Sequence, residues 1–166
     1  MNGANNNDFT VKFANVNGTG SSSANGMFMK SLFRMGIPVV GKNYFPSNIQ
    51  GLPTWYEVRA NENGYLAPSG SVNIMVAMNA QTYDEDLNAV EPGGFLIYDS
   101  SWPRETLMSR DDITVLGVPL AKMCNEAFDT ARSRTLMKNT TYVGVLAALL
   151  EMDMKVIEQL LLDTFG

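Results

Sequence analysis

A turn rich in glycine and serine, Gly18-Thr-Gly-Ser-Ser-Ser-Ala-Asn-Gly26, has the composition of an anion-binding loop. It follows an alternating apolar stretch, Phe9–Val16, that predicts a β-strand, and it leads into apolar residues at helical spacing. Backbone amides at the start of such a helix favour a negatively charged group in front of them. The candidate contacts to a phosphate-like anion, or to a neighbouring subunit, are Gly18, Gly20, Ser21 and Ser22.

The same turn fits a dinucleotide site poorly. The third glycine of a dinucleotide-binding turn would fall where Ser23 stands, and the second strand should end in an acidic residue, where Lys42 and Asn43 stand instead. The hydroxyls and amides of Ser21–Ala24 could still hold a pyrophosphate or line a partner interface. Alternatively, these small residues only allow the helix to close onto the sheet.

A second unusual segment joins two predicted strands, Asn43-Tyr-Phe-Pro-Ser-Asn-Ile-Gln-Gly-Leu-Pro-Thr-Trp-Tyr-Glu-Val-Arg59. A simple connector would be short and polar, whereas this one mixes apolar residues, prolines and amides. Ser47, Asn48 and Gln50 do not suit a core, because an unpaired buried amide costs about 1–3 kcal/mol. Trp55 and Tyr56 belong to the next strand, where one faces the core and the other faces the opposite side.

Several reaction classes are excluded by what the chain lacks. It has no histidine and one cysteine, so alone it can build neither a cysteine-held iron–sulfur cluster nor a histidine metal site. Nucleophilic catalysis by a Ser–His or Cys–His pair would need a partner chain. Cys124 lies in an apolar helical context and is expected to be a buried structural thiol. Asp99 and Asp111-Asp112 lack the spacing of a magnesium or calcium loop, so no metal is expected.

Composition predicts one globular domain. The chain has 166 residues, of which 45% are hydrophobic, and its net charge is −5. Its basic residues are scattered, and the nearest approach to a cluster, Arg132, Arg134 and Lys138, is expected to be a solvated helix end, so nucleic acid is not an expected partner. There is no long apolar run and no signal peptide, which indicates a soluble cytoplasmic protein without a membrane segment.

The elements that position these candidates alternate between strands and helices. The predicted strands are 9–16, 37–40, 54–60, 72–78, 95–98 and 113–116. Helices are predicted from about 27 to 36, within 79–90, from Pro119, and twice within 143–165, with Asp153 as an N-cap. This order predicts an α/β fold, a three-layer sandwich with helices on both faces of a mainly parallel sheet.

Three local expectations accompany this reading. Pro92-Gly-Gly94 is predicted to be a turn, and the acidic run Asp84-Glu85-Asp86 is expected to be solvated. Glu57 and Arg59 share one face of a strand, which permits an ion pair, expected at the surface, or a subunit contact.

The segment Phe45-Pro-Ser-Asn-Ile-Gln-Gly-Leu-Pro-Thr-Trp-Tyr56, with the glycine turn before it, resembles the gamma-type domain of the 2-oxoacid:ferredoxin oxidoreductases. It is most similar to the version at the front of the alpha subunit in 2-oxoglutarate-oxidising members. The resemblance implies a Rossmann-like gamma domain over 9–166, truncated at its C-terminal end, after a flexible polar tail, 1–8. In the family the turn is usually Gly-x-Gly-Gly-Gln-Gly, and here Ser21–Ser23 replace its last three positions.

The resemblance also implies a function. The enzyme would convert a 2-oxoacid to acyl-coenzyme A and CO₂ while reducing ferredoxin. The resemblance to 2-oxoglutarate-oxidising members implies that 2-oxoglutarate is the oxoacid. This domain would not be catalytic alone: thiamine diphosphate, Mg and a [4Fe-4S] cluster would lie in the remaining alpha portion and the beta subunit. The connector would face the channel for coenzyme A and the 2-oxoacid, with contacts from Ser47, Asn48, Gln50 and Gly51.

Two other functions stay open from the residues alone. One is a stand-alone nucleotide- or anion-binding regulatory module that uses the Gly18–Gly26 turn. The other is a purely structural docking domain without ligand contacts.

Overall fold

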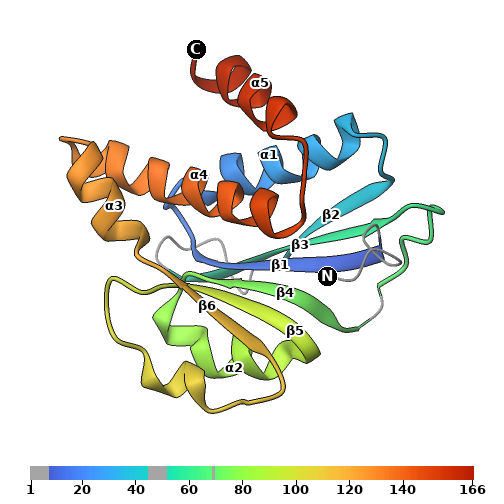
Figure 1. The fold of residues 1–166 in the computed structure, drawn as a ribbon, viewed down its shortest axis with the longest axis horizontal. Coiled ribbons are helices and arrows are strands. Elements are labelled where there is room, and N and C mark those ends of the chain that lie inside the picture. The colour runs from blue at the N-terminus through green and yellow to red at the C-terminus, as the bar shows by residue number, and fades with distance from the viewer. Residues whose placement is uncertain (1–7, 45–51, 69) are drawn as a thin grey trace.

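The first strand, β1 (Asp8–Val16), lies inside a sheet that extends on both of its sides (Figure 1). The computed structural model describes residues 8–44, 52–68 and 70–166, and in these residues six strands follow the order β2-β3-β1-β4-β5-β6. The other strands are β2 (Val39–Tyr44), β3 (Pro53–Asn61), β4 (Val72–Ala77), β5 (Val90–Asp99) and β6 (Thr114–Val118). All six predicted strands are therefore present, with boundaries that differ by a few residues.

The sheet is mainly parallel, as predicted. β1 pairs in parallel with β4, β4 with β5, and β5 with β6. β3 runs antiparallel to both β1 and β2, so β2 has the same direction as β1. The carboxyl end of β2 and the amino end of β3 consequently lie at the same end of the sheet as the carboxyl end of β1.

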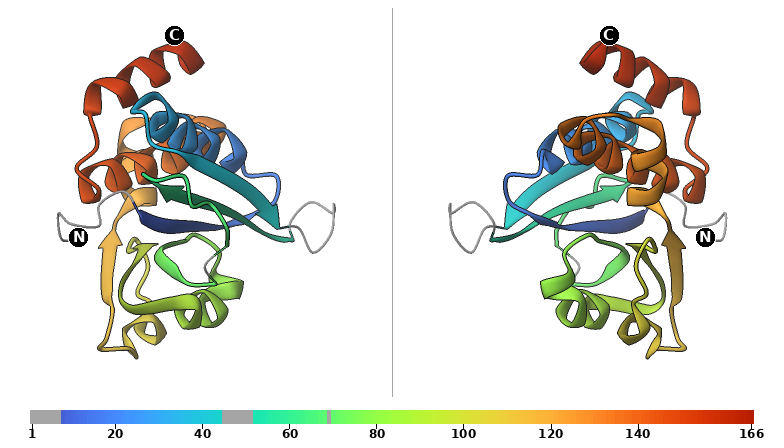
Figure 2. Two further views of the ribbon diagram at one scale, coloured as in Figure 1. Left: turned by 90° about the vertical axis from the view of Figure 1, so that its right-hand side faces the viewer. Right: turned by 90° about the vertical axis from the view of Figure 1, so that its left-hand side faces the viewer.

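Helices cover both faces of the sheet, which confirms the three-layer α/β prediction (Figure 1). One face carries α1 (Ser21–Arg34), α3 (Leu120–Ala127) and α4 (Ala131–Leu149), and α5 (Met154–Phe165) lies outside α1 (Figure 2). The other face carries α2 (Tyr83–Ala89), and the short 3₁₀ turns are η2 (Ala80–Thr82) and η3 (Glu105–Met108). Asp153 caps α5 as predicted, since its carboxylate accepts a bond from the Lys155 amide.

Two apolar clusters hold the layers together because side chains alternate across β1. Phe9, Val11 and Phe13 pack toward α1 and α4, whereas Ala14 packs toward α2. The Phe13 ring contacts Phe28 of α1 and Tyr142 of α4, with centroid separations of 5.6 Å in both pairs. α1 and α4 are thus fixed over the centre of the sheet.

Two local predictions were wrong. Pro92-Gly-Gly94 is part of β5 rather than a turn, because the positive φ of Gly93 and a register shift beside Asn73 admit these residues to the strand as an irregularity. The helix expected to begin near Val143 begins earlier, at Ala131, so Arg132 is exposed in the first turn of α4, as expected of a solvated helix end. Thr130 provides the N-cap of α4 by accepting a bond from the Ser133 amide.

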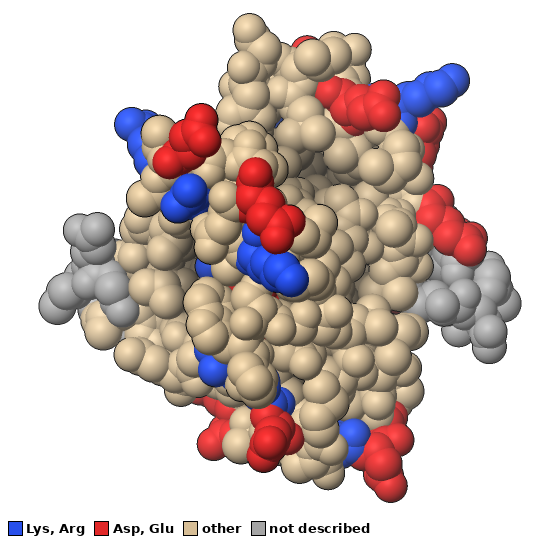
Figure 3. All heavy atoms as spheres, turned by 60° about the vertical axis from the view of Figure 1, so that its left-hand side comes forward, with Lys and Arg blue, Asp and Glu red and all other residues tan. Residues whose placement is uncertain are grey.

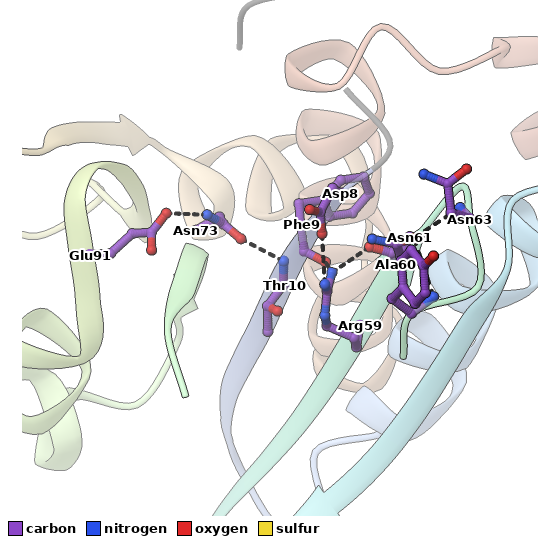
Figure 4. Close-up of polar contacts among 10 residues, drawn as sticks. Asp8, Phe9, Thr10, Arg59, Ala60, Asn61, Asn63, Asn73 and Glu91 are labelled. Carbon is purple, nitrogen blue, oxygen red and sulfur yellow. Dashed lines mark hydrogen bonds and ion pairs between the residues drawn. The ribbon is translucent and has the colours of Figure 1, made fainter. Parts of the chain in front are cut away.

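The amino end of β1 is held by a polar network that differs from the prediction (Figure 4). Arg59 does not pair with Glu57; its guanidinium lies 2.6 Å from the Asp8 carboxylate and donates to the carbonyls of Phe9 and Ala60. Asp8, expected to end the tail, is the first residue of β1. Because the Arg59 side chain is mostly buried while Glu57 lies two pairs further along the ladder, the strand carbonyls compete successfully for the Arg59 donors.

A second set of contacts in the same region joins β1 to its other neighbours. The Asn73 side chain accepts a bond of 2.7 Å from the Thr10 amide and donates to the Glu91 carboxylate (Figure 4). Both networks lie at the amino end of β1 and are therefore separate from the predicted ligand turn, which follows its carboxyl end.

Candidate functional site

A polar pocket of about 160 Å³ lies where β1 ends and α1 begins. Its lining includes all four predicted turn residues, Gly18, Gly20, Ser21 and Ser22. The remaining lining residues come from β1, the residue that follows it, α1, β2 and β3: Asn15, Asn17, Asn25, Asn43, Thr54 and Tyr56. The pocket is at the carboxyl end of parallel strands, where open α/β sheets usually bind ligands.

The turn is shorter than predicted because α1 begins at Ser21. Gly18 and Gly20 have φ values of 87° and 76°, a left-handed conformation that lets the chain reverse direction within a few residues. Ala24, Met27 and Phe28 already face the core at helical spacing, which extends the helix back into the serines. Ser21 and Ser22 are therefore helical residues, and Gly26 lies inside α1.

The amino end of α1 carries no compensating group among the described residues. Its N-cap is Gly20, which has no side chain to accept a bond from the first amides, and no acidic residue occupies the first turn. The exposed amides and the helix dipole therefore favour an anion at this end of α1.

Three buried side chains, Asn15, Asn25 and Tyr142, form a polar network beside the pocket. The Asn25 side-chain Nδ2 donates to the Asn15 side-chain Oδ1 over 3.1 Å, and the Tyr142 hydroxyl donates to the Asn25 Oδ1. Burial raises the pKa of Tyr142, with a hydrogen bond from Asn15 acting in the opposite direction. The phenol therefore stays protonated, and the network fixes β1, α1 and α4 relative to one another.

A further contact ties the turn to α4. The Asn139 amide donates to the Thr19 carbonyl over 2.9 Å, although the two residues are 120 positions apart. On the other side, the Thr19 hydroxyl donates to the Val16 carbonyl over 2.8 Å. Sequence reasoning missed Asn139 and Tyr142. The available signal was that these two polar side chains lie three residues apart on an otherwise apolar face of the helix.

The strand residues on either side of the β2–β3 connector border the same pocket. Asn43 precedes the connector, Thr54 and Tyr56 follow it, and the Leu52 carbonyl accepts a bond of 2.9 Å from the Asn17 amide. The four connector residues predicted to contact ligand, Ser47, Asn48, Gln50 and Gly51, lie outside the described residues. The structure thus brings the glycine-serine turn next to the end of β2 and the start of β3.

The orientation of the two adjacent aromatics is confirmed. Tyr56 packs on the α1 side of the sheet and its hydroxyl lies 3.2 Å from the Met29 sulfur, whereas Trp55 packs on the α2 side. Burial raises the pKa of Tyr56, so this phenol also stays neutral. Tyr56 forms one wall of the pocket. The alternation of side chains along a strand predicts which face of the sheet Tyr56 occupies, but not that it lines a pocket.

The turn also borders an open groove of about 440 Å³ on its opposite side. This groove is lined by Gly18, Thr19 and Gly20 together with Ala131, Arg132, Thr135 and Leu136 from the start of α4. The glycine-serine turn therefore separates the pocket from the groove. Residues of β2 and β3 line the pocket, whereas residues of α4 line the groove.

The acidic run on α2 is not entirely solvated, contrary to expectation. Asp86 is 1% exposed and accepts bonds from the Trp55 indole over 2.9 Å and the Thr82 hydroxyl over 2.7 Å. Because Tyr83, Asp86 and Leu87 share the sheet-facing side of α2, the carboxylate is carried into the interior. Burial raises the pKa of Asp86, while the bonds from Trp55 and Thr82 lower it.

Asp86→Asn should reduce the pH dependence of stability. With a folded-state pKa above the unfolded value of 3.8, the native state binds the proton more tightly, so the free energy of unfolding decreases as pH rises through this interval. Asn removes the titrating charge and keeps an acceptor for Trp55. Urea unfolding from about pH 4 to about pH 7 should show a smaller decline for this variant than for wild type.

Asp84→Asn is the matched control, since Asp84 is exposed on the same helix. An equal decline in wild type and Asp86→Asn would show that the buried carboxylate does not contribute to the pH dependence.

Cys124 is buried, as predicted, with its sulfur 4.0 Å from the Thr141 hydroxyl. Within 8–44, 52–68 and 70–166, no three His, Cys, Asp or Glu side chains gather closely enough to hold a metal. No helix in these ranges is long and apolar enough to cross a bilayer. On the face drawn in Figure 3, basic side chains are scattered among acidic ones rather than forming a single patch.

The fold and the pocket define an α/β domain with a polar site at the carboxyl end of its parallel strands. Residues 10–166 match the family model described as pyruvate ferredoxin/flavodoxin oxidoreductase. The chain belongs to this family.

One sequence relative is the alpha subunit of 2-oxoacid:ferredoxin oxidoreductase 2 from Aeropyrum pernix, which is 28% identical over 123 residues. The match covers 74% of this chain and 19% of that protein, so the chain spans about a fifth of its relative.

Solved structures have the same fold. The 2-oxoglutarate:ferredoxin oxidoreductase from Magnetococcus marinus, with 2-oxoglutarate, coenzyme A and succinyl-CoA bound, superposes with a TM-score of 0.83 at 21% identity, over 96% of this chain and 27% of that chain. A pyruvate oxidoreductase subunit from Thermotoga maritima gives 0.77 at 15% identity, over 96% of this chain and 86% of that chain. The gamma subunit of a keto/oxoacid ferredoxin oxidoreductase from Geobacter sulfurreducens gives 0.74 at 14%, over 95% and 87%. The predicted gamma-type fold is confirmed.

Proposed function

We propose that this chain is the non-redox domain of a 2-oxoacid:ferredoxin oxidoreductase and that 2-oxoglutarate is the oxoacid. The domain covers the active site and helps to place coenzyme A, while the enzyme forms acyl-coenzyme A and CO₂ and reduces ferredoxin. The observation that carries the proposal is the pocket that joins the glycine-serine turn to the ends of β2 and β3 on either side of the connector. Family membership and the fold shared with the Magnetococcus marinus enzyme support it.

The pocket suits one anionic group rather than a whole coenzyme, since its volume is about 160 Å³. Coenzyme A offers phosphates and 2-oxoglutarate offers carboxylates, and either group would be attracted by the uncompensated amides of α1. Ser47, Asn48, Gln50 and Gly51 of the connector are proposed to supply the remaining contacts. By binding a remote part of the substrate, the domain orients the reacting part and excludes water from it.

The redox chemistry belongs to other parts of the proposed assembly. Thiamine diphosphate, Mg and a [4Fe-4S] cluster, held by the remaining alpha portion and the beta subunit, would supply decarboxylation and electron transfer. Ferredoxin is the proposed electron acceptor, and the proposed location is the cytoplasm, without nucleic-acid or membrane partners. This chain's own contribution is binding and positioning, which fits a site built from amides, hydroxyls and asparagines.

The test is kinetic and uses the complex purified from its own cells. The complex should reduce viologen in a reaction that depends on 2-oxoglutarate and coenzyme A. Asn48→Ala and Gln50→Ala should each raise KM for coenzyme A or the oxoacid by about fivefold to tenfold, the effect of one lost ligand hydrogen bond. Asn88→Ala, at an exposed position on α2, is the control.

Unchanged KM values for both substrates would contradict the assigned connector contacts. A lone chain without activity would favour the regulatory module as the function. The uncompensated end of α1 supports that alternative as well, and pyrophosphate binding by the isolated chain, measured by calorimetry, would distinguish it.

A further inference from the structure

We infer that α4 positions the glycine-serine turn for its ligand and that Asn139 and Tyr142 are the positioning residues. Neither side chain lines the pocket. Tyr142 bonds to Asn25, which lines it, and Asn139 bonds to Thr19, which lies between the two lining glycines Gly18 and Gly20. The inference rests on the proposed function, because it assumes that the turn contacts an anionic substrate.

Asn139 controls the direction of one peptide group in the turn. Its side chain is 2% exposed and donates to the Thr19 carbonyl over 2.9 Å. In a trans peptide the carbonyl and the following amide point in opposite directions, so the Gly20 N–H points away from α4. The pocket lies on that side, since its walls come from β1, α1, β2 and β3. Asn139 therefore turns a backbone donor away from α4 and toward the side where the ligand would bind.

Leu136 prevents the turn from relaxing toward α4. A Cβ placed on Gly20 would lie 3.1 Å from the Leu136 side chain, so the backbone of the turn is closely supported there. Leu136, Asn139 and Tyr142 follow one another at three-residue spacing on the same side of α4. This side of the helix thus contacts the turn and the start of α1 in succession.

Tyr142 fixes the first turns of α1. It is fully buried, its ring packs on Phe13, and its hydroxyl donates to the Asn25 side chain. Asn25 in turn donates to Asn15 at the end of β1. The network determines the position of α1 along its axis relative to β1, and with it the position of the α1 amides.

These polar contacts do more than attach α4 to the sheet. Val143, Leu146 and Ala147 already attach it through the apolar cluster. A buried amide gains little net stability over an apolar group, because its desolvation cancels most of the hydrogen-bond energy. What the polar pairs add is a defined geometry at the turn.

The experiment uses the assembled complex with Asn139→Ala and Tyr142→Phe, and Thr141→Val as the control. The Thr141 hydroxyl donates to the Met137 carbonyl within α4 and lies 4.0 Å from the Cys124 sulfur of α3, away from the turn. Hydrogen exchange of the amides at 18–22, without substrate, should be about fivefold faster in the two test variants. KM for coenzyme A or for the oxoacid should rise by about fivefold to tenfold, with kcat within about twofold of wild type. The control should match wild type in all three measurements.

Gly20→Ala separates failure of this inference from failure of the proposed function. Alanine at a φ of 76°, with Leu136 only 3.1 Å away, distorts the turn directly. If Gly20→Ala raises KM but Asn139→Ala and Tyr142→Phe do not, the positioning role of α4 is wrong and the proposed function stands. If none of the three raises KM, the turn does not serve the substrate and the proposed function fails at this site.

Discussion

Ser22→Glu is expected to stabilise the domain and to weaken substrate binding in the assembled enzyme. Ser22 is exposed in the first turn of α1 and lines the pocket. A carboxylate there compensates the helix dipole, which should add about 0.3–1 kcal/mol to the free energy of unfolding. The same charge repels an anionic substrate group, so KM for coenzyme A or 2-oxoglutarate should rise by about 10-fold to 100-fold. Urea unfolding and steady-state kinetics measure the two effects.

Opposite signs in the two measurements are what make the substitution informative. A variant that merely damages the fold would lower stability and activity together. Ser22→Gln is the neutral control of equal size, and Ser23→Glu places the charge on the same turn at a residue outside the pocket lining. If Ser22→Glu leaves both KM values unchanged, the amide end of α1 does not bind the anion. Equal effects of Ser22→Glu and Ser23→Glu would indicate repulsion at a distance rather than contact.

Gly41→Ala should destabilise the domain by about 1–3 kcal/mol, the usual cost of overpacking. Gly41 is on β2, and the Tyr56 side chain lies across it. A Cβ at this position would come within 2.6 Å of the Tyr56 ring carbon that bears the hydroxyl and 2.8 Å from the Met29 sulfur. The Tyr56 ring, held between β2 and α1, must therefore move, and the wall that it forms in the pocket moves with it. Urea unfolding would give the loss of stability, and kinetics of the complex the change at the pocket.

Gly26→Ala is a control that should change the free energy of unfolding in the opposite direction. Nothing lies within 4 Å of a Cβ at Gly26, and the residue is inside α1, so alanine should stabilise by about 0.5–1 kcal/mol. The cost at Gly41 should fall when Tyr56 is replaced by alanine, because the obstructing ring is then gone. An equal cost in that background would place the strain elsewhere.

Local sequence patterns predicted the sheet well because, along most of the strands, the apolar residues of the sequence are the residues that are buried in the structure. β1 and β4 are buried on both faces and read as apolar segments, and Asp153 was recognisable as an N-cap from its place between two helical stretches. The fold class followed from the alternation of these elements. The start of α4 was missed because its first two turns are polar and carry no apolar period; its position is set by Thr130 and by packing on α1.

The site was only partly accessible to sequence reasoning. Gly18 to Ser22 could be found because glycines and serines between a strand and a helix are a local signal. Asn139 and Asp86 could not be assigned, because their partners, Thr19 and Trp55, are far away in the chain. Arg59 was misassigned for the same reason: the neighbouring strand β1 supplies Asp8 and the Phe9 carbonyl as acceptors in place of Glu57.

The bond between Asn139 and Thr19 also determines when the site can form during synthesis. The turn and the first helix emerge from the ribosome long before α4, and the two are separated by 120 residues. Contacts of such sequence separation form late, after the intervening loop has closed. A nascent chain that contains the sheet but lacks α4 therefore has the residues of the turn without their final geometry. Under the proposed function, the turn therefore acquires its ligand-binding geometry only after most of the domain has been translated, and incomplete chains are expected not to sequester the substrate.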